Sequence, residues 1–377
     1  MTPSPGLFST ILSFLACIGP LIFIHELGHY FVGRWFGVKA ETFSIGFGRE
    51  IAGWTDRRGT RWKIGWMPLG GYVKFKGDMN PASQPSPEWL ALPPEERAQT
   101  FQAKPVWQRF LIVAAGPFTN LLAAVLLFMG IFGALGYPTT PPVVTGVVEG
   151  AAADRAGIAP GDRLVSLNGK HVRNFAEVRE YVMLRPSEQI QVTVDRNGQR
   201  LTVPVTSGSD TARDQFGNEA RIGTLGVQSN ALKLEKLPLS RLPDEAVRQT
   251  WSSLQQMVVA LGQFIQGERS VKELGGPLKI AQISGQQASL GWLPFFWLMA
   301  IISINLGFIN LLPIPLLDGG HLLFYLIEGV RRKPLRPEAQ EWAFRTGLAA
   351  LLALMIFVTL NDLASFGVWN RLGGLIG

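Results

Sequence analysis

The sequence of 377 residues is poor in cysteine and in charged side chains. A single cysteine, Cys17, excludes an intrachain disulfide, so the fold has to hold without one. Charged residues make up 17% of the chain, whereas about a quarter is usual for soluble domains. The composition therefore argues against a soluble globular enzyme.

Long apolar runs account for the missing charge. Hydrophobic residues make up 47% of the chain, and they gather in stretches 7–32, 110–136, 292–327 and 344–367. A helix needs about 20 apolar residues to cross a bilayer, and each stretch is long enough. The first stretch lacks both a preceding Lys or Arg and a small-residue cleavage site, so we expect a retained helix and not a signal peptide. The sequence predicts an integral membrane protein.

The connections between these stretches differ in charge. Segment 33–109 holds 12 Lys or Arg against 7 acidic residues, and segment 331–343 opens with two arginines and a lysine. The positive-inside rule places both segments in the cytoplasm, and both termini with segment 137–291 on the opposite side. The net charge of +7 is explained in this way, and no nucleic-acid motif accompanies it.

Segment 142–207 predicts a small β-rich domain. Short Val/Leu runs alternate with turn residues, and Asn197-Gly198 between alternating strands is a strong hairpin signal. The stretch AGIAPGDRLVSLNG (156–169) resembles the PDZ domains of bacterial envelope proteases. PDZ domains bind extended peptides at a sheet edge, and a spacer or gate without a ligand is an equal alternative.

Residues 251–267 place apolar side chains on one helical stripe, with Gln and Ser on the other face. We expect an amphipathic connector over 245–290, and a substrate clamp is the alternative.

The stretch FIHELGHYF (23–31) puts ionisable side chains at the end of an apolar run. His25 and His29 are four residues apart, so both can face one metal ion from a single side of a helix. H-E-x-x-H is the zinc metalloprotease signature, with Glu26 as general base for a water molecule. Ionisable groups at membrane depth are costly and mark function. The alternative is a pair of structural histidines at the membrane edge.

A catalytic zinc ion takes three protein ligands, so a third must come from elsewhere. His171 lies in the β-rich domain on the opposite side, which leaves the candidates His321, Asp318, Glu328 and Asp362.

The run 292–327 would measure about 54 Å as one helix, far more than a bilayer core of about 30 Å. Two prolines, Pro313 and Pro315, and the pair Gly319-Gly320 predict a break. Irregular backbone at membrane depth is tolerated where it lines a wet cavity. Asp318 lies in this break and is the expected third ligand, His321 supports the site or the fold, and Glu328 is an ordinary interfacial residue.

These motifs in this order resemble the site-2 protease family of intramembrane zinc metalloproteases, in its regulator-of-sigma-E protease (RseP) group and single-PDZ form. The resemblance rests on HELGH (25–29), GPFTN (116–120), the PDZ-like segment, GTRWKIGWMPLGGYVKFKGD (59–78) and SINLGFINLLPIPLLDGGHLLF (303–324). Some members carry two tandem PDZ domains, whereas this chain has room for one, so inferences from a tandem do not carry over.

The resemblance implies Zn²⁺ on His25, His29 and Asp318, with Glu26 as base. It also implies that Asn310 touches substrate or steadies the site, and Asn305 is a weaker candidate of the same kind. Hydrogen bonding between helices is the alternative for both asparagines.

Gly116 and Asn120 predict close packing of the second membrane helix against the catalytic one. Residues 42–76 alternate apolar and polar side chains around Gly70-Gly71, which is a β-hairpin pattern. The resemblance implies a membrane-associated element here, and Gly70 and Gly71 at its strand edge are expected to bind an unwound substrate. A purely structural hairpin is the alternative.

The expected fold is a multi-pass α-helical membrane protein with four transmembrane helices, a membrane-associated β-hairpin element and one extracytoplasmic PDZ domain (α+β). The expected domains are helix 1 (7–33), the β element (38–80), a cytoplasmic linker (81–107), helix 2 (108–136), the PDZ domain (142–207), the connector (245–290), helix 3 with its broken segment (292–330) and helix 4 (343–367).

The expected function is intramembrane zinc endopeptidase in regulated intramembrane proteolysis. The resemblance implies single-span substrates such as anti-sigma factors, with remnant signal peptides as further candidates, and an upstream site-1-type protease in a stress-response role. It also implies the bacterial inner membrane, with the PDZ domain and termini periplasmic and the active site near the cytoplasm. An extended peptide on the PDZ domain and membrane lipid are further expected partners, and nucleic acid is not. A membrane metal transporter and a non-catalytic PDZ scaffold are the alternatives; few polar residues in 110–136 and 344–367 argue against the first, and the intact Glu26 against the second.

Overall fold

The computed structural model describes residues 6–77, 92–213, 219–230, 233–267, 275–333 and 336–365. The chain divides into two compact units, one formed by residues 1–131 and 243–377 and the other by 132–242. The expected linker at 81–107 lies partly outside the described residues, since its description begins at 92.

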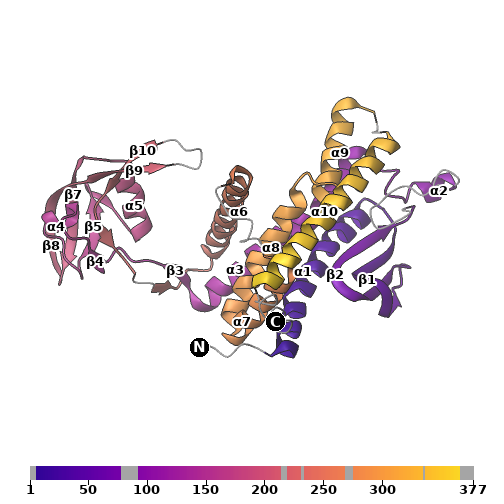
Figure 1. The fold of residues 1–377 in the computed structure, drawn as a ribbon, viewed down its shortest axis with the longest axis horizontal. Coiled ribbons are helices and arrows are strands. Elements are labelled where there is room, and N and C mark those ends of the chain that lie inside the picture. The colour runs from indigo at the N-terminus through magenta and orange to yellow at the C-terminus, as the bar shows by residue number, and fades with distance from the viewer. Residues whose placement is uncertain are drawn as a thin grey trace, which may run out of the picture. The chain divides into compact units, whose positions relative to one another are not determined.

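The first unit is a helical bundle with a small sheet beside it (Figure 1). Its helices are α1 (Leu7–Trp35), α2 (Pro94–Arg97), α3 (Val106–Leu135), α6 (Leu242–Gln266), α7 (Pro277–Ser289), α8 (Trp292–Leu311), α9 (Asp318–Arg331) and α10 (Pro337–Ser365). In the described part of the chain, four helices are long and apolar enough to cross a membrane, namely Leu7–Trp35, Val106–Leu135, Trp292–Leu311 and Glu338–Ala364. The prediction of a four-span membrane protein is confirmed at this level.

Small side chains let the central helices approach closely. A Cβ atom on Gly28 of α1 would lie 2.5 Å from the carbonyl oxygen of Ala115 on α3. A Cβ on Gly307 of α8 would lie 3.0 Å from the carbonyl oxygen of Pro117, also on α3. Thr119 of α3 donates its hydroxyl to the carbonyl of Ile24 at 3.1 Å. Helix α3 is therefore packed tightly against both α1 and α8, as small residues allow in membrane helices.

The third apolar run is broken as predicted, and the helix resumes earlier than expected. Helix α8 ends at Leu311, and α9 begins at Asp318, so Asp318 is the first residue of the new helix and does not lie within the break. Leu316 in the connection adopts a positive φ of 79°. A Cβ on Gly320 would lie 2.5 Å from the carbonyl oxygen of Ile314, so the turn folds back against the start of α9.

The expected connector over 245–290 contains two helices, α6 and α7. The carboxylate of Asp362 on α10 accepts hydrogen bonds from the backbone N–H groups of Gly276 and Lys279, each at 3.0 Å. Asp362 thus caps the N-terminus of α7, because the first N–H groups of a helix have no partner within it.

The β element consists of β1 (Ala40–Thr55) and β2 (Arg61–Phe75). Residues 42–45 pair with 71–74 on one side and with 61–64 on the other, while 50–55 pair with 61–65. The paired segments therefore lie in the order 50–55, 61–65, 42–45 and 71–74. The C-terminal half of β2 is outermost, and its other edge has no partner strand among the described residues. A simple hairpin was expected, and the doubled pairing was not.

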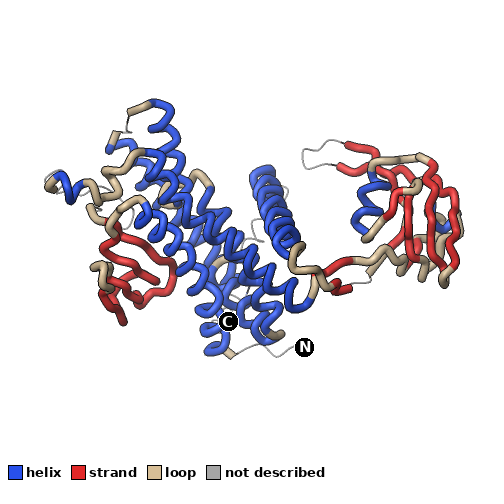
Figure 2. The backbone as a smooth tube through the Cα atoms, turned by 180° about the vertical axis from the view of Figure 1, so that it is seen from behind, coloured by secondary structure: helices blue, strands red, loops and turns tan. Residues whose placement is uncertain are grey.

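The second unit is built around the four-stranded sheet β6-β5-β7-β8 (Figure 2). Its elements are β3 (Tyr137–Thr139), β4 (Gly146–Val147), α4 (Ala152–Arg155), β5 (Arg163–Leu167), β6 (Lys170–His171), α5 (Phe175–Met183), β7 (Gln189–Arg196), β8 (Gln199–Thr206), β9 (Gly208–Arg213), β10 (Glu219–Thr224), β11 (Val227–Gln228) and β12 (Lys233–Glu235). Its own apolar core joins the sheet to α5 through buried side chains such as Leu164, Val178 and Val192.

Two local features of this unit follow from its sequence. Asn197 and Gly198 link β7 to β8, so the predicted hairpin is confirmed, and both residues have positive φ, of 53° and 87°. The unit also extends beyond 207, because β11 pairs with β4 and the carbonyl of Leu225 accepts from the N–H of Ala153 at 2.9 Å.

Candidate active site and metal centre

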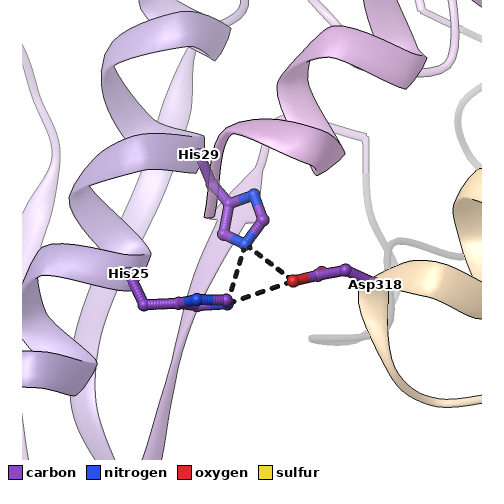
Figure 3. A group of neighbouring side chains, drawn as sticks. All are labelled: His25, His29 and Asp318. Atoms are coloured by element: carbon purple, nitrogen blue, oxygen red, sulfur yellow. Dashed lines mark hydrogen bonds and ion pairs between the residues drawn. The ribbon is translucent and has the colours of Figure 1, made fainter. Parts of the chain in front are cut away.

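Three side chains, from two helices that are far apart in the sequence, converge on one point (Figure 3). His25 and His29 lie one turn apart on α1, and their Nε2 atoms are 3.2 Å from each other. Asp318, at the start of α9, places Oδ2 3.1 Å from Nε2 of His25 and 3.5 Å from Nε2 of His29. Two imidazole nitrogens and one carboxylate oxygen are the donor set of a catalytic zinc site with one position left for water.

The surroundings of these atoms fit a cation. Oδ2 of Asp318 is buried and receives no hydrogen bond within the described part of the chain. A buried carboxylate oxygen that faces two nitrogen atoms, with no donor of its own, has to be stabilised by a positive charge. The three residues therefore fit zinc both in donor type and in their mutual placement.

Helix α3 packs against the rings of the two histidines. Nδ1 of His29 donates to the carbonyl oxygen of Ile112 at 2.9 Å, which leaves the lone pair of Nε2 free for a metal. Gly116 adjoins both rings: a Cβ atom there would overlap Nε2 of His29 and would lie 2.8 Å from Nε2 of His25. Gly116 therefore provides space for the imidazoles, which is more than the helix packing expected from the sequence.

Glu26 lines the same cavity of about 480 Å³ as the three candidate ligands. Its side chain is buried, and a Cβ atom on Gly71 would lie 2.9 Å from Cγ of Glu26. The outer part of β2 thus passes directly beside the expected general base. Gly70 has a φ of 109°, a conformation that favours glycine, and it also lines the cavity.

The two asparagines of α8 are placed differently. Asn310 lines the cavity, whereas Asn305 is exposed and is not among the cavity's lining residues. The two asparagines are five residues apart, which is one full helical turn plus about 140°. Their side chains therefore leave α8 in different directions. Of these two asparagines, Asn310 alone borders the cavity.

The remaining ligand candidates have other roles. His321 lines the cavity and packs on the ring of Phe344, with a centroid distance of 5.1 Å. Glu328 accepts a hydrogen bond from Nη2 of Arg109 at 2.7 Å in a largely buried ion pair between α9 and α3, so it is more than an ordinary interfacial residue.

Sequence reasoning missed how closely Gly116 and Asn120 approach the histidines. Asn120 is fully buried, lines the cavity, and has Nδ2 3.2 Å from Nδ1 of His25. The signal was present in GPFTN, since a glycine and an asparagine four residues apart face the same side of a helix. What the sequence could not supply is that this side faces His25.

Comparison with known proteins agrees with this geometry. The profile of Peptidase family M50 matches residues 13–354. A protein of Agrobacterium fabrum whose name describes it as a zinc metalloprotease is 44% identical, over 94% of this chain and 96% of its own length. Metalloprotease MmpA of Caulobacter vibrioides is 36% identical, over 98% of this chain and 99% of its own length.

Among solved structures, the PDZ domain of the SdrC-like protein of Listeria monocytogenes is 13% identical with a TM-score of 0.19, covering 23% of this chain and 85% of that domain.

The helices, the site and the relatives together define a membrane zinc metalloprotease. The chain belongs to Peptidase family M50.

Proposed function

We propose that this metalloprotease cuts peptide bonds within or beside the transmembrane helices of other membrane proteins, with His25, His29 and Asp318 as zinc ligands. The observation that carries the proposal is the position of the cluster. Two ligands and Glu26 project from α1, a helix apolar enough to cross a membrane, into one cavity with the third ligand. A substrate for such a site has to be reached at or near membrane depth.

The residues of the cavity divide the chemistry between them. Zinc, when bound, polarises the scissile carbonyl and activates a water molecule. Glu26 takes a proton from the attacking water and delivers it to the leaving nitrogen as the C–N bond breaks. Burial of Glu26 keeps competing water away from this proton transfer. Asn310 offers its side-chain amide to the substrate backbone from the α8 side of the cavity.

The β element supplies a second support for the proposal. A transmembrane helix hides its carbonyls in its own hydrogen bonds, so it has to be unwound before it can be cut. The outer half of β2 has Gly71 beside Glu26 and Gly70 in the lining of the same cavity, and its edge is one to which an unwound segment can add as a strand. Bulky side chains are absent at these two positions, so the backbone of a substrate can come close to Glu26.

The finer assignments rest on the sequence. The second unit acts as a PDZ-type domain for an extended peptide on the extracytoplasmic side, supported by its short strands and by α5 beside the sheet. Substrates are single-span proteins of the anti-sigma-factor type, first trimmed by another protease during a stress response. Basic residues in 33–109 support an orientation in which the active site lies near the cytoplasmic side of a bacterial inner membrane.

The test compares the wild-type chain with Glu26→Gln in detergent, measuring bound zinc and cleavage of a tagged single-span substrate. We expect Glu26→Gln to keep its zinc and to lose activity by about 10²–10⁴-fold, the range for a missing general base. Glu341→Gln on α10, which removes an exposed carboxylate paired with Arg345, is the matched control and should cut normally. Equal cleavage by wild type and Glu26→Gln would reject the proposed mechanism.

A further inference from the structure

Helix α3 carries three positions that face the two histidines of α1. Ile112, Gly116 and Asn120 are spaced by four residues, so they form one stripe along the helix. Ile112 meets His29 through its carbonyl oxygen, and Gly116 adjoins both rings. Asn120 is the member of the stripe that adjoins His25.

The two ends of the stripe present the same kind of contact. Nδ1 of His29 points at a carbonyl oxygen 2.9 Å away, and Nδ1 of His25 points at the side-chain amide of Asn120, whose Nδ2 is 3.2 Å away. Oδ1 of Asn120 is buried and has no hydrogen-bond partner in the described residues. The amide of Asn120 is thus an incompletely satisfied polar group within a buried contact, which is costly unless it serves the site.

The two orientations of this amide have opposite consequences for His25. If Nδ2 donates to Nδ1, the ring hydrogen of His25 is on Nε2 and points at Asp318, and no lone pair is left for a metal. If the amide is turned by 180°, Oδ1 accepts the hydrogen of Nδ1, and the lone pair of Nε2 faces the site. Only the second orientation matches the way Ile112 holds His29.

We propose that Asn120 is the positioning residue of His25: its Oδ1 accepts the Nδ1 hydrogen and holds the ring in the tautomer that binds zinc through Nε2. The inference rests on the proposed zinc site. Helix α3 then sets the tautomer of both histidine ligands, once with a backbone carbonyl and once with a side chain. A residue that touches no zinc therefore contributes to zinc affinity.

Zinc affinity of the full chain, measured in detergent by competition with a chromophoric chelator, tests the proposal. Asn120→Leu keeps the side-chain volume and removes the acceptor, and we expect zinc to bind 10–100-fold more weakly, as is typical when an outer partner of a ligand is lost. Asn120→Asp keeps an acceptor oxygen and should stay within a few-fold of wild type. In protein with ¹⁵N-labelled histidine, Asn120→Leu should also shift the His25 ring signals toward a mixture of tautomers.

Ser303→Ala is the matched control. Ser303 on α8 is as buried as Asn120 and donates its hydroxyl to the backbone carbonyl of Asn120 at 2.7 Å. Its replacement by alanine therefore disturbs the same packing without removing a contact to His25. We expect its zinc affinity to be unchanged. Wild-type affinity in Asn120→Leu, or an equal loss in Asn120→Leu and in either Asn120→Asp or Ser303→Ala, would overturn the role of Asn120. His25→Ala tests the proposed zinc site separately from the role of Asn120, because unchanged zinc binding in His25→Ala would reject the site itself.

Discussion

Two aspartates, one in each unit of the chain, show how differently the same side chain can be used: Asp162 is buried, and Asp318 is half-buried with a buried Oδ2. Asp162 in the second unit accepts hydrogen bonds from Nε and Nη2 of Arg196, each at 2.7 Å, and from the N–H of Ala159 at 2.9 Å. Asp318 faces two imidazole nitrogens, and its Oδ2 receives no hydrogen bond from the described residues. A buried carboxylate with all its partners stabilises a fold, whereas one that lacks them is held ready for a ligand.

The first way to break the comparison is to remove the charge of Asp318. Asp318→Asn should reduce bound zinc from about one ion per chain to almost none, since one of three protein ligands loses its anionic oxygen. Cleavage should fall to background while the helical content stays unchanged. Zinc content by atomic emission and circular dichroism check both expectations, and full zinc occupancy in Asp318→Asn would show that this aspartate is not a ligand.

The complementary change is Asp162→Asn, which should affect stability and leave the zinc site intact. Losing the charge-assisted hydrogen bonds should lower the free energy of unfolding of the second unit by about 1–2 kcal/mol. This value lies toward the lower end of the range for such bonds, because the side chain of Arg196 is partly exposed and solvent screens the pair. Hydrogen exchange of β5 and β7 measures the change. If zinc binding fell as well, the assignment of Asp162 to fold stability alone would be wrong.

The smallest effect is a pH dependence confined to the second unit. The guanidinium of Arg196 holds the pKa of Asp162 below its ordinary value, which is about 3.9 in an unfolded chain. The ion pair therefore contributes its full stability above about pH 4, and the contribution is lost as the pH falls through the lowered pKa of the folded state. Exchange rates of β5 and β7, corrected for intrinsic pH effects, should rise below pH 4 in the wild type and change less in Asp162→Asn. Identical profiles for the two proteins would contradict this account.

The sequence predicted which side chains come together at the site better than it predicted their surroundings. Ligand spacing on one helix and a broken apolar run were enough to select His25, His29 and Asp318, because both patterns are local and have few structural solutions. The contact of Gly116 and Asn120 with the histidines was missed, because it depends on which face of α3 meets α1. The doubled pairing of β1 and β2 was missed for a similar reason, since strand alternation defines faces but not neighbours.

Predictions for single residues also differed in how well they matched the structure. Asn197-Gly198 was correctly read as a hairpin turn because positive φ at two successive residues is demanding, and few residue pairs meet that demand. Asn305 was grouped with Asn310 as a weaker candidate because both are asparagines of the same apolar run, although their side chains leave α8 in different directions. Patterns tied to backbone geometry were reliable here, and patterns tied only to residue type were not.

The separation of the proposed zinc ligands along the chain has a consequence for synthesis. His25 and His29 belong to the first helix, whereas Asp318 opens α9 and is made 289 residues after His29. Chains emerge from the ribosome with the N-terminus first, so His25, Glu26 and His29 enter the membrane long before the third ligand exists. A nascent or truncated chain that ends before α9 carries the complete H-E-x-x-H sequence and still cannot hold zinc with all three ligands. The order of the helices therefore delays assembly of the proposed ligand set until α9 has been made.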